Sequence, residues 1–396
     1  MKGVILVENS FVHPYMPNSV PENKKAMLDE LGINSVEDIY KSIIPDELLY
    51  KERLDIPEPI RSEYELKRHV MGILNRDITT EEYTSFLGAG CYKHQVPAIC
   101  DEINSRGEFL TAYCGDTYSD HGKMQAIFEY TSMMGELLDT DVVSYTTYDG
   151  GQAVASSLRM AVRAVREKGM AGKVILVPKT MNPEIYSQVV QYCRNVAEVR
   201  KIAYEPETGL MDLEELKEQL AKKNVAAVFF ENPTYLGNFE TRGEEIAKLA
   251  HDAGAYCVVQ TEVAALGIME SPVNQGADIV CGDIQPLGMH IQFGGGQAGF
   301  IACNQNMDLV EQFPTYMYGI TETEKEDTYG WGRAMNYRSS HGSRENAKEY
   351  FGTETGLWAI TAGVYLASMG PQGMYELGET IIQNAAYLED ILDEIP

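Results

Sequence analysis

A regular alternation of apolar runs with helical stretches begins at residue 142 and constrains the fold more than any other feature of the chain. The apolar runs are short and show no alternation of polar with apolar residues, so both faces of each strand are expected to be buried. Such strands, alternating with helices, are typical of an α/β fold with a mainly parallel sheet covered on both sides. The predicted strands are 142–147, 174–178, 225–230 and 256–260, and the predicted helices between and around them are 151–168, 183–194, 212–223 and 240–253.

The remaining sequence predicts two flanking regions around a large domain at 81–330. Residues 1–80 are punctuated by prolines and predict a helical N-terminal arm, with helices at 21–31, 35–43 and 62–75. We expect this arm to pack on another surface, because it has too few apolar residues for a core of its own. Residues 331–396 predict the start of a C-terminal small domain with two helices, at 354–369 and 371–393. A small domain of this size is unfinished, so we expect the chain to be shortened at this end.

Polar residues follow several of the predicted strands directly. In an open α/β sheet the carboxyl ends of the strands line the ligand crevice, so these segments are expected to converge on one cleft. Glycines at 150 and 151 open a helix after a strand, which suits either the binding of an anion by free backbone amides or a simple tight turn. The four segments are 148–152, 231–237, 260–262 and 282–290.

The segment 278–302 joins two apolar runs through a glycine-rich turn and contains no basic residue. No lysine or arginine occurs between Lys248 and Lys325, so this part of the chain supplies neither a cation nor an amine nucleophile. Gly294–Gly299 matches the GxGxxG pattern but precedes a predicted strand, whereas the dinucleotide motif follows one. Nucleotide binding is therefore not expected.

Charge and cysteine content exclude several classes of partner. The formal net charge of −27 argues against nucleic acids and anionic membrane surfaces, which bind basic patches. No secretory leader is recognisable, and no run approaches the roughly 18 apolar residues of a membrane span. Seven cysteines are expected to be reduced thiols in the cytoplasm. Cys91, His94 and Cys100 supply only half of a zinc pattern, so no metal site is predicted.

Several blocks of sequence resemble the P-protein family of the glycine cleavage system. Within that family the chain looks like subunit 1 of the two-subunit bacterial glycine dehydrogenase (decarboxylating), and the similarity extends over essentially the whole chain. The blocks are SEYELKRHV (62–70), SFLGAGCYKHQVPAI (85–99), SRGEFLTAY (105–113), YDGGQA (148–153) and ENPTYLG (231–237).

The resemblance implies the fold of type I pyridoxal-phosphate (PLP) enzymes, with an N-terminal arm, a large domain and a small domain. In these enzymes a lysine near the end of a late strand forms a Schiff base with PLP. The counterpart region, 283–290, has no lysine. This absence matches a subunit that has lost its own PLP site while its partner subunit carries the cofactor.

The resemblance also implies which residues form the remains of the cofactor cleft. Glu262 stands about where an acid would bind the pyridinium nitrogen, and Gln285 about where the lysine would be. The complete set of implied cleft residues is Tyr148, Asp149, Gly150, Gly151, Asn232, Glu262 and Gln285.

A loop near residues 111–121 is implied to reach the substrate channel, with Tyr113, Asp116, Tyr118 and His121 as candidates. After Tyr113 the chain continues with CGDTYSDHG, one residue shorter than the loop that is usual in the family. Two alternatives to a glycine decarboxylase subunit therefore stay open. One is a paralogous subunit acting on a different amino acid or amine, and the other is a non-catalytic scaffold or regulatory subunit.

The implied activity belongs to an assembly and not to this chain alone. The resemblance implies a PLP-bearing subunit 2 as the partner, in an α2β2 arrangement. The assembly would decarboxylate glycine and transfer the aminomethyl group to the lipoyl arm of the H-protein.

Overall fold

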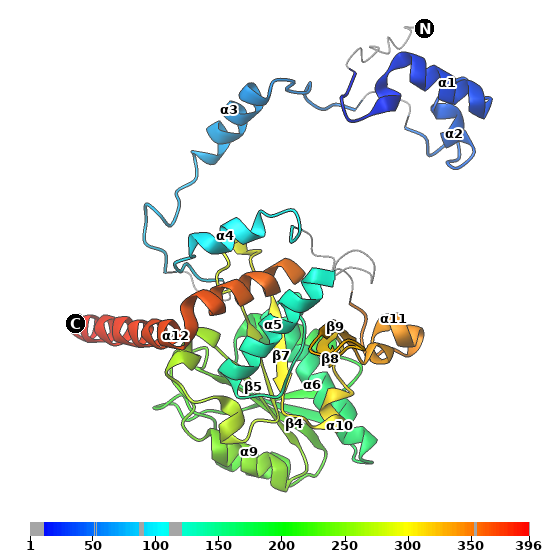
Figure 1. The fold of residues 1–396 in the computed structure, drawn as a ribbon. Coiled ribbons are helices and arrows are strands. Elements are labelled where there is room, and N and C mark those ends of the chain that lie inside the picture. The colour runs from blue at the N-terminus through cyan, green and yellow to red at the C-terminus, as the bar shows by residue number, and fades with distance from the viewer. Residues whose placement is uncertain are drawn as a thin grey trace. The chain divides into compact units, whose positions relative to one another are not determined.

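The computed structural model divides the chain into two compact units, Met1–Tyr83 and Thr84–Pro396. Figure 1 shows both units as ribbons, and each is described here by itself. The structure describes residues 12–50, 52, 54–86, 91–110, 121–351 and 355–395.

The first unit is helical, as predicted, with α1 (Pro21–Leu31), α2 (Glu37–Lys41) and α3 (Glu63–Leu74). The Ser62 hydroxyl accepts a hydrogen bond from the Glu65 backbone N–H and caps α3. None of these three helices contains a buried residue, so the described part of this unit has no hydrophobic core of its own.

The second unit is built on a seven-stranded, mainly parallel sheet, which confirms the predicted fold class. Its strand order is β1-β7-β6-β5-β4-β2-β3, and β7 runs antiparallel to both of its neighbours. The strands are β1 (Val142–Val143), β2 (Val174–Pro178), β3 (Glu198–Ile202), β4 (Val225–Asn232), β5 (Tyr256–Thr261), β6 (Ile279–Asp283) and β7 (Gly299–Cys303).

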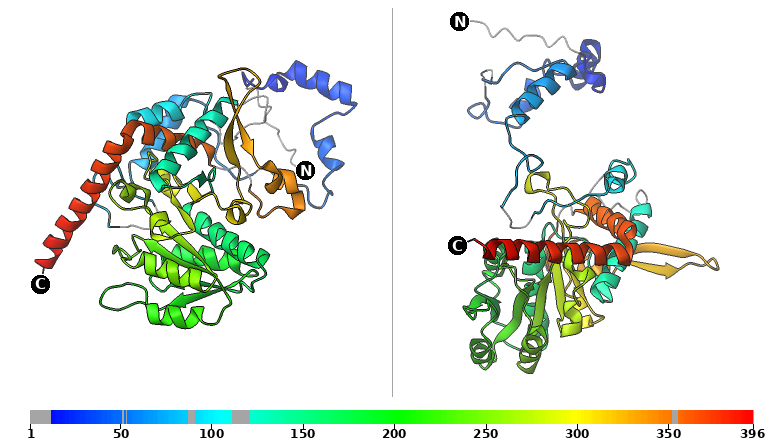
Figure 2. Two further views of the ribbon diagram at one scale, coloured as in Figure 1. Left: turned by 60° about the horizontal axis from the view of Figure 1, so that its bottom comes forward. Right: turned by 90° about the vertical axis from the view of Figure 1, so that its left-hand side faces the viewer.

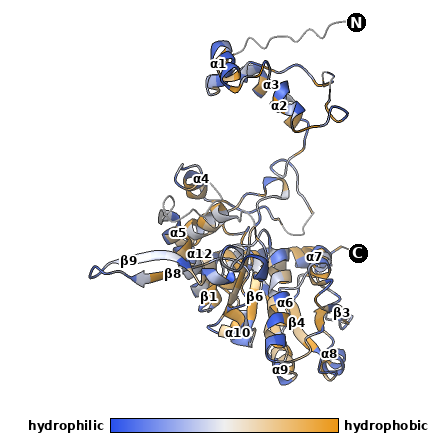
Figure 3. Cartoon of the chain, turned by 90° about the vertical axis from the view of Figure 1, so that its right-hand side faces the viewer, coloured by the Kyte–Doolittle hydropathy of each residue, from blue (hydrophilic) through white to orange (hydrophobic). Residues whose placement is uncertain are grey.

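Helices cover both faces of this sheet and create two hydrophobic cores. Alternate residues of one strand enter different cores: Val174 and Leu176 of β2 enter one, and Ile175 and Val177 enter the other. Figure 3 shows hydrophobic residues concentrated on the strands. One face is covered by α5 (His121–Leu138), α8 (Leu213–Leu220), α9 (Gly243–Asp252) and α12 (Gly356–Asp393), and the other by α6 (Gly150–Glu167), α7 (Pro183–Cys193) and α10 (Met307–Val310).

The C-terminal part of the unit consists of a hairpin, short helices and the long helix α12. The two predicted C-terminal helices are joined in α12 across a kink at Gly370, with Pro371 directly after it. Figure 2 shows the hairpin of β8 (Met317–Glu322) and β9 (Tyr329–Ala334) extending away from the sheet, followed by α11 (Ser340–Ser343). Residues 331–396 belong to the same compact unit as the sheet, so the boundary at residue 330 stays a prediction. Within the described ranges, no helix is both long and apolar enough to cross a membrane.

Several elements were missed by the sequence analysis. The helix α4 (Ala98–Asn104) lies in a stretch without clear periodicity, β3 is a partly exposed edge strand, and β8 pairs with β9 outside the main sheet. The first predicted strand, 142–147, is shorter than expected. Beyond Val143 only isolated backbone hydrogen bonds connect this segment to β7. Ser144 N–H donates to the Ile301 carbonyl, and Thr147 N–H donates to the Gly299 carbonyl.

Candidate functional site: a carboxylate-lined cavity

A cavity of about 760 Å³ lies at the carboxyl edge of the sheet, where β4, β5 and β6 end. The first turns of α6 and α7, the loop 92–97 and the second half of α12 complete its wall. Its polar lining residues are Lys93, His94, Asp149, Asn182, Glu184, Gln188, Glu231, Thr234, Gln260, Thr261, Glu262, Asp283, Gln297, Thr380 and Asn384.

Two carboxylates of the chain occupy the amino end of α6. Asp149 Oδ1 accepts a hydrogen bond from Gln152 N–H at 2.7 Å, and Asp283 Oδ2 accepts one from Gly150 N–H at 2.8 Å. Backbone amides at a helix start favour anions, because they are free donors at the positive end of the helix dipole. Here the protein's own carboxylates, separated by more than 130 residues, already take two of these amides.

Three carboxyl groups that line the cavity have raised pKa values. Burial raises the pKa of Asp283 to about 7, with backbone hydrogen bonds from Gln285 and Gly150 opposing the shift. Burial likewise raises the pKa of Glu231 to about 7 and that of Glu262 to about 6. Each raised pKa means that ionising the carboxyl group is costly where it stands.

Gln285 holds the loop 92–97 against the cavity. Its buried side chain accepts a hydrogen bond from Tyr92 N–H at 3.2 Å and donates to the carbonyls of Tyr92 and Met289 at 3.0 and 2.9 Å. His94 Nε2 lies 3.1 Å from the Gln285 carbonyl and 2.9 Å from that of Met289. The position expected for a lysine is therefore filled by an amide that fastens two segments together.

The predicted cleft residues fall into two groups. Asp149, Gly150, Gly151 and Glu262 line the cavity. Tyr148, Asn232 and Gln285 do not: Tyr148 lies against the Phe351 ring, with 5.7 Å between centroids, and the other two side chains are buried beside the cavity wall.

The predicted substrate-channel residues cannot be placed in the same way. Tyr113, Asp116 and Tyr118 lie outside the described residues, and His121 is described only as the first residue of α5. Sequence reasoning missed the roles of Asp283 and His94, and it did not single out Glu231 or Gln260 from their strand ends. Their position after an apolar strand was the available signal for Glu231, Gln260 and Asp283.

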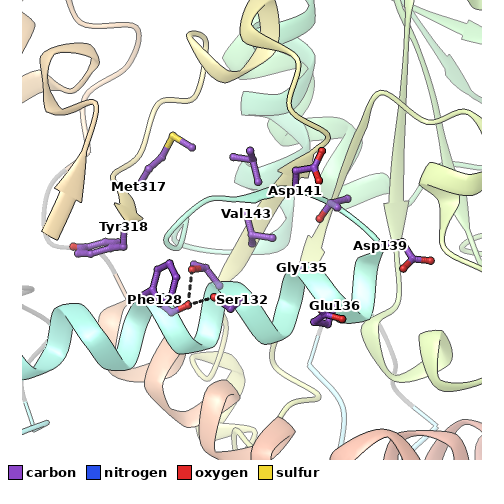
Figure 4. A pocket seen from close by; sticks show the side chains of 12 residues that line it. Phe128, Ser132, Gly135, Glu136, Asp139, Asp141, Val143, Met317 and Tyr318 are labelled. Atoms are coloured by element: carbon purple, nitrogen blue, oxygen red, sulfur yellow. Dashed lines mark hydrogen bonds between the residues drawn. The ribbon is translucent and has the colours of Figure 1, made fainter. Parts of the chain in front are cut away.

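A second, polar hollow of about 630 Å³ lies beside α5, β1 and β8 (Figure 4). Two of its carboxylates already hold neighbouring loops: Asp141 accepts a hydrogen bond from Gln305 N–H, and Asp139 accepts one from the Asn274 side chain. The hollow therefore contributes to local structure. No group of His, Cys, Asp and Glu among the described residues is arranged to hold a metal ion.

A mainly parallel, doubly covered sheet with a cavity at its carboxyl edge defines the fold of the type I PLP-dependent enzymes. A solved sphingosine-1-phosphate lyase from Burkholderia pseudomallei shares this fold at 13% identity, with a TM-score of 0.62 over 89% of this chain and 79% of that one. More narrowly, the chain belongs to the glycine cleavage system P-protein family, whose model matches residues 13–395. The resemblance seen in the sequence is thereby confirmed.

Two relatives extend this assignment over the length of the chain. The probable glycine dehydrogenase (decarboxylating) subunit 1 of Pyrococcus horikoshii is 37% identical over 383 residues, which cover 96% of this chain and 83% of the relative. A crystal structure of glycine decarboxylase (P-protein) of the glycine cleavage system, in inhibitor-bound form, is 31% identical with a TM-score of 0.85. That comparison covers 98% of this chain and 83% of the solved one.

The residues of the cavity do not fit PLP. The segment where the sequence resemblance implies a Schiff-base lysine carries Asp283 at the end of β6 and Gln285 just after it, and the amides that suit a phosphate are bound to carboxylates. Lys93 is the one lysine among the lining residues, and it comes from the loop 92–97 instead of a strand end. Carboxylates around the amino end of α6 would also repel the phosphate of PLP.

Proposed function

We propose that this chain is the PLP-free subunit of a two-subunit glycine dehydrogenase (decarboxylating). In this proposal subunit 2 carries PLP, the two subunits form an α2β2 assembly, and a lipoyl H-protein accepts the aminomethyl group. The family match over residues 13–395 supports the reaction, and the carboxylate-filled cavity at the end of β6 supports the absence of PLP from this chain. The reduced state of its free cysteines suits the cytoplasm.

The contribution of this chain is structural support for the shared active site. Gln285 and His94 hold the loop 92–97, and the sequence continues from α4 into the loop with Tyr113, Asp116 and Tyr118. We propose that this second loop and His121 wall the substrate channel of the assembly. The first unit, whose described helices have no buried residues, is proposed to cover a surface of the partner subunit.

Borohydride reduction in the presence of PLP tests the cofactor assignment. The purified chain, incubated with PLP and reduced, is expected to give no lysine-linked adduct by peptide mass spectrometry, whereas subunit 2 is expected to give one. The Lys93→Ala variant serves as a control, because Lys93 lines the cavity. A stoichiometric adduct on this chain that disappears in Lys93→Ala would show that it holds PLP itself.

Glycine-dependent exchange of labelled bicarbonate in the assembled pair tests the reaction. Exchange with glycine supports the proposal, and turnover of a different amine without glycine exchange would favour the paralogue. Tyr113→Phe is expected to lower exchange while leaving assembly intact, and Tyr204→Phe, an exposed tyrosine elsewhere in the second unit, is the matched control. A scaffold would lose activity only when assembly is lost.

A further inference from the structure

Hydrogen-bond acceptors outnumber positive charges in the cavity. Five of its lining residues are carboxylates, Asp149, Glu184, Glu231, Glu262 and Asp283, whereas Lys93 is the only lysine or arginine among them. Within the described part of the chain, no ion pair includes any of these five carboxylates. Buried carboxylates without a cation are costly, because the lost hydration is not replaced by an opposite charge.

Backbone amides are the donors that the described residues supply to the buried carboxylates. Glu231 accepts hydrogen bonds from Asn182 N–H at 3.1 Å and from Tyr235 N–H at 3.3 Å, and Glu262 accepts one from Ala264 N–H at 3.2 Å. A carboxylate can accept about four hydrogen bonds, so each of these groups retains acceptor capacity.

One side-chain carbonyl beside Glu231 lacks a donor. Gln260 lines the cavity, and its Oε1 is buried without a hydrogen-bond partner among the described residues. Glu231 pairs with Gln260 in the parallel register of β4 and β5, so the two side chains leave the sheet on the same face. Each unsatisfied buried acceptor costs free energy that a donor-rich ligand would recover.

Apolar side chains complete the wall between the acceptors. Ile185 comes from α7, and Tyr365, Met369, Leu377 and Ile381 come from α12. A ligand for this cavity needs hydrogen-bond donors and positive charge beside the acceptors, and a hydrocarbon segment against this wall.

We propose that the cavity binds a small organic ammonium ion, with the ammonium group between Glu231, Gln260 and Glu262 and its hydrocarbon part against α7 and α12. An ammonium group has three donors and no acceptor, and so matches the acceptors that the described residues leave open. The proposal rests on the proposed function only in that the cavity is free of PLP. The ammonium group comes either from a free amine or from a lysine side chain of a partner subunit.

Calorimetric titration of the full chain with 1,4-diaminobutane tests the proposal. Saturable binding of one molecule per chain is expected, with no binding of succinate, which has the same chain length and the opposite charge. Glu231→Gln and Glu262→Gln are each expected to weaken the binding about tenfold, because a charge-assisted hydrogen bond becomes a neutral one. Glu218→Gln, a carboxylate exposed on α8, is the matched control and is expected to bind as the wild type does.

Gln260→Leu provides a variant that is not expected to threaten folding, since the side-chain carbonyl has no partner to lose. It is expected to weaken the binding of 1,4-diaminobutane while the melting temperature stays the same or rises. The proposal is overturned if the folded chain does not bind the diamine, or if the three cavity variants bind it as tightly as Glu218→Gln does.

Repeating the titration on the assembled pair separates the two sources of the ammonium group. Retained binding indicates a free amine, whereas binding by the isolated chain that is lost on assembly indicates that a partner's lysine occupies the cavity. Pyridoxine 5′-phosphate, which has the ring and phosphate of PLP but no aldehyde to condense with the diamine, distinguishes the two proposals from each other. If it competes with the diamine, the PLP-free assignment fails while the amine site stands.

Discussion

Asp283 ends β6 and connects three segments of the chain. Its two carboxyl oxygens accept hydrogen bonds from Gly150 N–H at the start of α6 and from Gln285 N–H in the following turn. The space at Gly150 fits this arrangement closely, because a Cβ atom there would lie 3.0 Å from the Asp283 Cβ. The same residue therefore fixes the start of α6 and the turn that presents Gln285.

Glu231 makes the stability of the protein depend on pH. Burial raises its pKa to about 7 from the ordinary 4.5, so the folded state holds the proton more tightly than the unfolded state does. Stability is then lost as the pH rises between these two values. Glu231→Gln removes the ionisation. The free energy of unfolding of the variant, relative to that of the wild type, is therefore expected to rise by on the order of 3 kcal/mol from pH 5 to pH 8.

Urea unfolding at a series of pH values measures this difference. Glu218→Gln is the control, and its stability relative to the wild type is expected to stay constant over the same interval. If Glu231→Gln instead becomes less stable relative to the wild type as the pH rises, the folded protein stabilises the ionised form of Glu231.

Gln285 is expected to stabilise the loop 92–97 more than it stabilises the sheet, because its side chain is bonded to Tyr92. Gln285→Ala removes three hydrogen bonds and leaves the Tyr92 backbone groups without their partner, at a cost of about 2–3 kcal/mol. Hydrogen exchange should accelerate first at residues 92–95. Gln125→Ala, on the exposed face of α5, should change neither quantity. Equal protection of the loop in both variants would contradict the role assigned to Gln285.

The sequence pointed to some residues at the strand ends, but it could not predict the contacts between residues far apart in the chain. Resemblance pointed to Glu262 and Gln285, which each come shortly after an apolar run, and of the two only Glu262 lines the cavity. The hydrogen bond from Gly150 to Asp283 joins residues 133 positions apart, and the contacts of His94 with Gln285 and Met289 span more than 190. Only the folded sheet brings such partners together.

Beside the cavity, η2 (Val263–Gly267) and α12 approach each other closely. A Cβ atom at Gly267 would overlap the backbone carbonyl of Met374, and one at Gly378 would lie 3.0 Å from the Ile268 side chain. Glycine at both positions allows the second half of α12 to lie on the segment that follows Glu262, and this contact closes one wall of the cavity.

Gly267→Ala is expected to destabilise the protein by about 2 kcal/mol or more, because backbone atoms on both sides must move apart. It should also weaken the binding of 1,4-diaminobutane, since the wall formed by α12 would shift. Gly122→Ala, at a helix position with no atom within 4 Å of the new Cβ, is the control and should leave unfolding unchanged or slightly favour the folded state. Chemical denaturation that gives equal midpoints for the two variants would contradict the close packing at Gly267.

At the level of elements, the buried strands were predictable and the edges were not. The strands β2, β4 and β5 are buried and apolar throughout, or nearly so, and the apolar runs placed their starts correctly. The edge strand β3 reads EVRKI and is partly exposed, so it lacks the apolar pattern. The hairpin of β8 and β9 is stabilised by pairing with itself, and its exposed positions carry no apolar alternation.

The whole molecule combines a unit with two cores and a unit whose described residues form none. The second unit buries both faces of its sheet, whereas the described helices of the first expose Tyr64, Val70 and Ile73, among other apolar side chains. Such apolar surface is characteristic of segments that another chain covers. The separate N-terminal arm at residues 1–80 was predicted from its prolines and short helices, because a region without enough apolar residues cannot form a core, and its boundary stays a prediction.

The hydrogen bonds of Asp283 with Gly150 and Gln285 would make the proposed loss of PLP from this chain difficult to reverse. A lysine at position 285 would lose the bonds that hold Tyr92, and it would still face a helix start whose amides are taken by Asp149 and Asp283. Removing either acid first would uncap α6 before any phosphate could replace it. Several substitutions would have to occur together, and each one alone would weaken the protein. Folding stability would therefore preserve the proposed PLP-free state of this chain, in addition to any advantage in the reaction itself.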